Sequence, residues 1–138
     1  MTDRQGEALN AYIVDLAARM GLADWEIYVG SERASKGANA SMDTSHGREV
    51  AWLMFPKGWW DRASEDRRND VVHELIHVVH RAQTNVVRVA LRESGYLPKR
   101  AWNVLWATFN EHTEIMVDHL AAIIAPTMPL LDDPEGDK

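Results

Sequence analysis

Residues 64–81 of the chain run SEDRRNDVVHELIHVVHR. Apolar side chains recur in this stretch at the spacing of an α-helix and cover a broad arc, so we expect a helix that is buried on most sides. Ser64 is expected to cap its first turn, where Glu65 and Asp66 oppose the positive end of the helix dipole. This helix is the element around which the predicted fold is arranged.

Two histidines and a glutamate lie inside that helix, in the order His73-Glu74-Leu75-Ile76-His77. Side chains four residues apart lie one above the other on a helix, so both imidazoles can reach one metal ion with Glu74 beside them. Neutral imidazole is a good zinc ligand, and the carboxylate can take a proton from water that the metal acidifies. We therefore predict that His73 and His77 bind Zn²⁺ and that Glu74 is the catalytic base.

A second acidic motif, Glu114-Ile115-Met116-Val117-Asp118, lies in an apolar stretch further along the chain. A catalytic zinc site needs a third protein ligand and one open position. We predict that Glu114 is this ligand. Asp118, one turn later, is predicted to accept a hydrogen bond from the free nitrogen of His73 or His77 and so to orient the ring.

Other titratable side chains are alternatives for these roles. His80 and Glu111 each lie one helical turn from a predicted ligand, so either could be the third ligand instead. Tyr96, His112 and His119 are candidates for a group that stabilises a developing oxyanion.

The composition limits the class of protein. A length of 138 residues fits one domain, predicted over 1–126, followed by a C-terminal tail over 127–138 whose residues 132–138 are expected to be solvated and disordered. Because the sequence has no cysteine, metal ligands must be His, Asp or Glu. The formal net charge of −6 argues against general binding to nucleic acid or to a membrane. The first residues lack the apolar core of a signal peptide, so a cytoplasmic protein is expected.

Around the central helix the pattern predicts an α+β fold. A first helix is expected over 4–20, ending at Gly21, and a last helix over 98–125, with a short helix over 85–93 before it. Three strands are expected over 25–29, 39–43 and 49–55; the turn formers between them, including 44–47, favour an antiparallel meander. We expect the first helix on one side of this sheet and the metal helix on the other.

The two motifs together resemble the gluzincin metallopeptidases, in which HExxH is followed by a glutamate from a later helix. The run from Glu114 to Pro126 is also similar to the acidic helix of small ImmA/IrrE-type peptidases of mobile elements and to minimal zincins encoded by phages. Those peptidases often carry a further histidine four residues after the second ligand, where this chain has Arg81. The resemblance implies a zincin-like fold, bound zinc and cleavage of peptide bonds.

The sequence therefore predicts a cytoplasmic zinc metalloendopeptidase that acts on a peptide or protein. The resemblance further implies that an edge strand near the metal pairs with an extended substrate, and residues 50–55 are the segment nominated for this role. Two alternatives stay open: a zinc hydrolase of non-peptide substrates, because activated water serves many hydrolyses, and a regulatory or structural module that only binds the metal.

Overall fold

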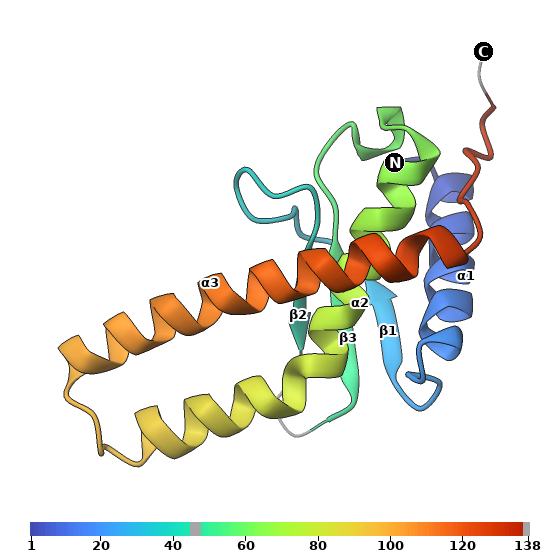
Figure 1. The fold of residues 1–138 in the computed structure, drawn as a ribbon. Coiled ribbons are helices and arrows are strands. Elements are labelled where there is room, and N and C mark those ends of the chain that lie inside the picture. The colour runs from blue at the N-terminus through green and yellow to red at the C-terminus, as the bar shows by residue number, and fades with distance from the viewer. Residues whose placement is uncertain (45–47, 137–138) are drawn as a thin grey trace.

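The structure is a computed structural model that describes residues 1–44 and 48–136 (Figure 1). Its elements are α1 (Asp3–Arg19), β1 (Glu26–Val29), β2 (Ser41–Thr44), β3 (Val50–Met54), α2 (Ser64–Val87) and α3 (Lys99–Ile124). The α+β class and the three predicted strands are thereby confirmed. Most of the predicted turn over 44–47 lies outside the described residues, as do the last two residues of the chain.

The three strands form one sheet in the order β1-β3-β2. β3 pairs in parallel with β1, from Glu26 opposite Val50, and antiparallel with β2, from Ser41 opposite Met54. The antiparallel meander predicted from the sequence is therefore wrong. The alternation of apolar residues identifies strands but does not determine which strands pair. The connection between β1 and β2 is long enough for β3 to lie between these two strands.

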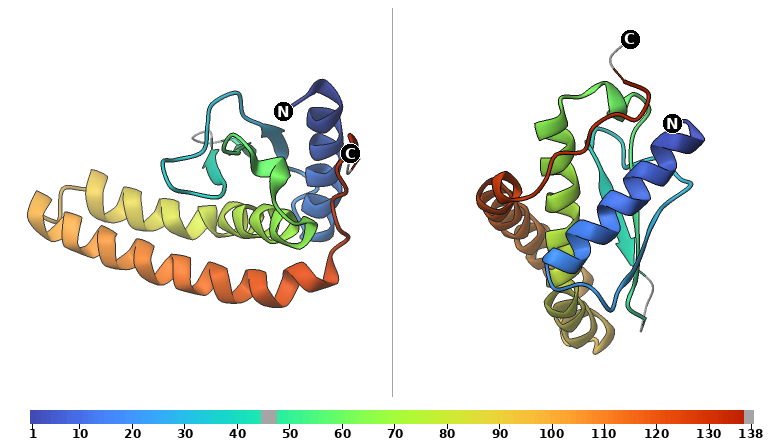
Figure 2. Two further views of the ribbon diagram at one scale, coloured as in Figure 1. Left: turned by 90° about the horizontal axis from the view of Figure 1, so that it is seen from above. Right: turned by 90° about the vertical axis from the view of Figure 1, so that its right-hand side faces the viewer.

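Both α1 and α2 pack against the same face of the sheet. Ile27, Ala51 and Leu53 are buried in one cluster with the apolar sides of the two helices. On the opposite face, Tyr28 and Trp52 lie side by side and are 47% and 37% exposed. The prediction that the metal helix covers the other side of the sheet is thus wrong: a sheet of this size has one buried face, and α2 shares it with α1 (Figure 2).

α2 is longer than the sequence predicts. It begins at Ser64, with Ala63 rather than Ser64 in the N-cap position, and it runs to Val87. Six further residues, Arg88–Glu93, continue it as a π-helix in place of the separate short helix predicted over 85–93. No glycine or proline occurs between residues 64 and 93, so no residue in that stretch favours an end to the helix.

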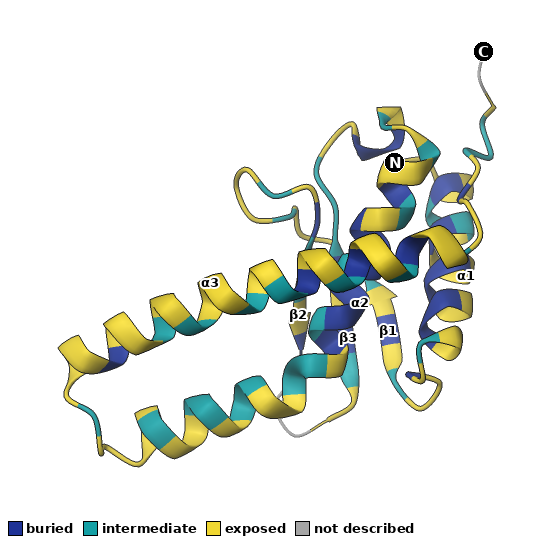
Figure 3. Cartoon of the chain, in the orientation of Figure 1, coloured by how far each residue is buried: buried dark blue, intermediate teal, exposed yellow. Residues whose placement is uncertain are grey.

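Beyond the sheet, α2 and α3 continue as a helical hairpin that projects from the body (Figure 1). We call residues 79–113 the arm. Trp102 is the one buried residue in the arm, and it begins a ladder of stacked rings that continues through Trp106 and Phe109, with centroids 5.1 and 5.6 Å apart. The arm therefore has almost no core of its own, as Figure 3 shows by its exposed and intermediate colours.

The segment after α3 packs back onto the body, although the sequence predicts a C-terminal tail over 127–138 that is solvated from residue 132 onward. Leu131 is buried in the main core. Near the start of α1, Thr2 Oγ1 donates to Glu135 at 2.9 Å, and Gln5 Nε2 donates to Asp133 at 3.2 Å. These contacts hold residues 128–135 against the first turn of α1.

Candidate metal centre

His73 and His77 from α2 meet Glu114 from α3 where the arm joins the body. The two Nε2 atoms are 3.1 Å apart. The Glu114 carboxylate lies between the rings, with one oxygen 3.5 Å from His73 Nε2 and the other 3.3 Å from His77 Nε2. One ligand atom from each of the three residues falls within 4.8 Å of the others, so this group could hold a metal ion. The structure thus brings together the three residues predicted as ligands.

Asp118 lies on the other side of the His73 ring. Its Oδ1 is 3.1 Å from His73 Nδ1, the nitrogen that faces away from Glu114. With Nδ1 donating to this carboxylate, the lone pair of the neutral ring sits on Nε2 and points toward His77 and Glu114. Asp118 is therefore placed to orient His73, and it makes no corresponding contact with His77.

Both histidines are half-buried, and burial affects the charge of His77. Burial is the largest influence on His77 and lowers its pKa, while the nearby Glu114 carboxylate raises it and His73 lowers it further. The net shift is downward, so the neutral imidazole is favoured at physiological pH. A neutral ring is the form that binds a metal ion.

Glu74 is the most deeply buried carboxyl group at the site, with 6% of its surface exposed. Burial raises its pKa to about 8, and repulsion from Glu114 and Asp70 adds to the rise. This carboxyl group therefore takes up and releases a proton close to neutral pH, which suits proton transfer. Glu74 also lines the same cavity as the three potential ligands.

Residues 35 and 37–42, from the segment that leads into β2 and its first two residues, also line the cavity. β2 is an edge strand whose far side is free of β-pairing, whereas β3 is paired on both sides. Residues 50–55, nominated from the sequence as the substrate-side strand, therefore lie in the centre of the sheet and cannot accept another strand. The strand beside the site is β2.

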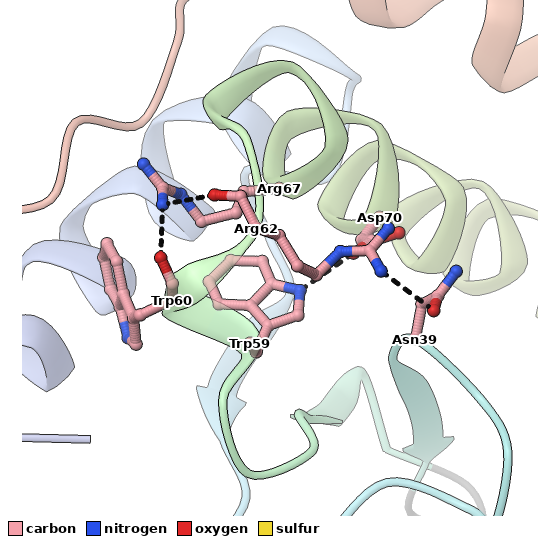
Figure 4. A network of polar contacts seen from close by, with 6 residues as sticks. All are labelled: Asn39, Trp59, Trp60, Arg62, Arg67 and Asp70. Atoms are coloured by element: carbon pink, nitrogen blue, oxygen red, sulfur yellow. Dashed lines mark hydrogen bonds and ion pairs between the residues drawn. The ribbon is translucent and has the colours of Figure 1, made fainter.

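A polar network that the sequence did not reveal adjoins the cavity through two lining residues, Asn39 and Asp70 (Figure 4). Asp70, one turn before His73, accepts a hydrogen bond from Trp59 Nε1 at 2.8 Å and pairs with Arg62 Nε at 3.1 Å. Burial still raises the pKa of Asp70, against the lowering effect of Trp59 and Arg62. The only sequence signal for Asp70 was its position one helical turn before a predicted ligand.

A second arginine fixes the loop that carries this network. Arg67 is buried and donates to the carbonyl oxygens of Trp60, Arg62 and Leu131 at 2.7 to 2.8 Å. Its guanidinium carbon also lies 5.1 Å from the ring centroid of Trp60, within the range of a cation–π contact. Arg67 thus links the start of α2, the loop before it and the C-terminal segment.

The other side chains that the sequence offered as ligands or oxyanion-stabilising groups lie outside the cavity. His80 contacts Gln83 and lines a different hollow between α2 and α3, together with His112. Glu111 and His119 are exposed on α3, and Tyr96 is 83% exposed near the tip of the arm. Within residues 1–44 and 48–136, none of these five side chains lines the cavity that holds Glu74. The structure therefore provides no support for them as ligands or as oxyanion-stabilising groups.

Comparison with known proteins returns no significant match to a family model, a curated protein or a solved structure. No helix in the described part of the chain is both long enough and apolar enough to cross a lipid bilayer.

Proposed function

We propose that this chain is a zinc-dependent metallopeptidase with a zincin-like fold, in which His73, His77 and Glu114 hold the metal. The observation that carries the proposal is the spacing of the donors. Tetrahedral zinc, with bonds of about 2.0–2.1 Å, holds its ligand atoms about 3.3–3.4 Å apart. Here the two Nε2 atoms are 3.1 Å apart, and Glu114 contacts them with different oxygens, Oε2 at 3.5 Å from His73 and Oε1 at 3.3 Å from His77. One ligand atom from each of the three residues lies within 4.8 Å of the others, so a small shift of the side chains would let them share one ion. Two imidazoles and one carboxylate are also a ligand set typical of catalytic zinc.

Zinc in this position supplies a Lewis acid that lowers the pKa of water and polarises a carbonyl group. Glu74 is the group of this chain that handles the proton. Its burial and its acidic neighbours raise its affinity for a proton, so the carboxylate is a better base than an exposed glutamate. The same group can later give that proton to the leaving amine.

β2 supports a peptide rather than a small molecule as the substrate. It presents an unpaired strand edge next to the cavity, with Ser41 and Met42 among the lining residues. An extended peptide can pair with such an edge through main-chain hydrogen bonds, which place a carbonyl group over the site without requiring a particular sequence. This arrangement favours a peptidase over a zinc hydrolase of other substrates.

The proposal is tested by zinc content and by peptide cleavage measured on the same preparations. Purified protein should hold about one equivalent of zinc, and His73→Ala and His77→Ala should each lose it. Glu74→Gln should keep the zinc while cleavage of peptides found by library screening falls by about 10²–10⁴-fold. Glu111→Gln, an exposed change of the same chemistry, is the matched control and should cleave normally. Equal cleavage by the Glu74 variant and wild type, or full zinc in both histidine variants, would refute the assignment.

A further inference from the structure

An apolar seam runs along α2 from the main core into the arm. Its six members alternate at intervals of three and four residues, which is the spacing of side chains that pack between two paired helices: Val72, Leu75, Val79, Ala82, Val86 and Val89. The first two, Val72 and Leu75, are fully buried in the main core. The pattern that holds α2 in the body therefore continues along the same helix face into the arm.

Beyond the body this helix face is exposed. Val79, Val86 and Val89 are 50%, 66% and 41% exposed, and Ala82 between them is exposed as well. α3 packs on a different side of α2, the side on which His80 lines the hollow between the two helices. Within residues 1–44 and 48–136 none of these three valines or Ala82 is buried, and we call the four residues the outer seam.

The tip of the arm is basic, whereas the body is acidic. Residues 90–100, at the tip, contain Arg92, Lys99 and Arg100 against Glu93, a formal charge of +2. The chain outside residues 79–113 contains ten Lys and Arg against nineteen Asp and Glu, a formal charge of −9. Opposite charges therefore lie at the two ends of the outer seam, and they distinguish one direction along it from the other.

We propose that two copies of the chain pair through their outer seams, with the two α2 helices antiparallel. Such a contact is self-complementary about a two-fold axis, because each copy presents the same apolar face to the other. The inference goes beyond the proposed peptidase activity and depends on neither metal nor substrate, since the outer seam is separate from the residues that line the cavity with Glu74.

The antiparallel direction follows from the charges. It places the basic tip of each arm beside the acidic body of the other copy, so that both ends of the contact are attractive. A parallel pair would instead bring the two basic tips together and the two acidic bodies together. Charge complementarity also favours a second copy over an anionic lipid surface, because a body with a formal charge of −9 is repelled by the headgroups that attract the tip.

The length of the outer seam limits the strength of the pair. From Val79 to Val89 the helix rises about 15 Å, at 1.5 Å per residue. Such a contact is smaller than the about 800 Å² per partner of a standard stable interface, so we expect a reversible pair with a Kd on the order of 10–100 μM. In dilute solution the separate chain predominates, and its arm stays exposed.

Sedimentation velocity of the full chain, from well below to well above this Kd, tests the proposal. Val86→Glu puts a carboxylate from each copy into the apolar contact and should raise the Kd by at least about tenfold. Val14→Glu is the matched control, because Val14 lies in α1 and is 60% exposed; it should form dimers as the wild type does. A wild type that stays monomeric throughout, or equal weakening by both changes, would overturn the proposal.

Cross-linking gives a second measurement that introduces no charge. The wild-type chain has no cysteine, so Val86→Cys and Val14→Cys each carry a single thiol. A short bismaleimide should join two Val86→Cys chains and leave the Val14→Cys chains single. Equal yields of cross-linked dimer from the two variants would show random collision and count against the outer seam.

The direction of pairing is tested by charge. Lys99→Gln/Arg100→Gln removes two positive charges from the tip and should weaken the antiparallel pair by about threefold, as should added salt. Tighter association of this variant would show that the tips repel each other, and it would overturn the antiparallel arrangement. A monomeric wild type that binds phosphatidylserine vesicles, and loses this binding with Val86→Glu, would replace the second copy by a lipid surface.

Discussion

Arg67→Met tests whether the conformation of the loop before α2 depends on one buried cation. Methionine replaces the unbranched stem of the arginine side chain but not its guanidinium group, so it cannot donate to the carbonyl oxygens of Trp60, Arg62 and Leu131. The contacts with Trp60 and Leu131 are buried, so water does not replace them there. A hydrogen bond from a charged donor contributes about 1.5–3 kcal/mol, and two such losses predict a fall of about 3–6 kcal/mol in the free energy of unfolding.

The assay is urea unfolding followed by tryptophan fluorescence, since buried Trp60 contacts the substituted side chain. Small domains have a total stability of about 5–15 kcal/mol, so the midpoint should fall clearly while the slope stays constant. Arg19→Met is the matched control, because its pair with Asp15 is exposed and should contribute only about 0.3–0.5 kcal/mol. A loss below about 1 kcal/mol for Arg67→Met would refute the reasoning and show that the carbonyl groups find other partners.

Three further changes test the site and its supports. Asp118→Ala should weaken zinc binding by about 10–100-fold yet leave a zinc-bound population, and Glu114→Ala should weaken zinc binding more. Dialysis against competing chelators ranks the two affinities, and the reverse order would make Asp118 the ligand. Burial raises the pKa of Tyr12 to about 12 from an ordinary 10, so its contribution to stability is complete below pH 10 and falls as the pH rises toward 12. Tyr12→Phe, which removes the hydrogen bond to Pro129, should flatten that fall in alkaline unfolding curves, and an unchanged slope would contradict the assignment. Gly58→Ala should lose about 1–2 kcal/mol because residue 58 has a φ of 80°. Gly6→Ala, in the first turn of α1, should instead gain up to about 0.5–1 kcal/mol. Thermal unfolding that ranks the two the other way would show that the backbone argument is wrong.

The features predicted correctly are those that the local sequence determines. The spacing of His73, Glu74 and His77 is a property of a single helix, and the apolar periodicity around them identifies that helix. Glu114 was placed beside them by the chemistry of the ligand set and by the resemblance to gluzincins. The structure brings these residues together, although their role in binding zinc stays a prediction.

The features missed depend on contacts between distant segments. The apolar residues Ile27 and Leu53 indicate that their segments are strands. Which strands pair, here β1 with β3, depends instead on how the whole sheet packs against the helices. For the same reason the edge strand was assigned to residues 50–55 instead of β2. The arm was missed because the apolar residues of α3, such as Trp102 and Val104, predict a helix with an apolar face but not what lies against that face.

The arm also divides the molecule into parts that open independently. A helical hairpin with one buried residue has little to oppose fraying, so its amide hydrogens should exchange with solvent long before those of Val71 or Leu75 in the core of α2. His73 and His77 lie among buried residues on α2, so their amide hydrogens should exchange slowly as well. Glu114 lies at the boundary, on a helix whose outer half opens readily. Local unfolding that starts at the arm tip therefore reaches one member of the ligand group while the other two stay in place, and the lifetime of the complete group is set by the arm rather than by the core.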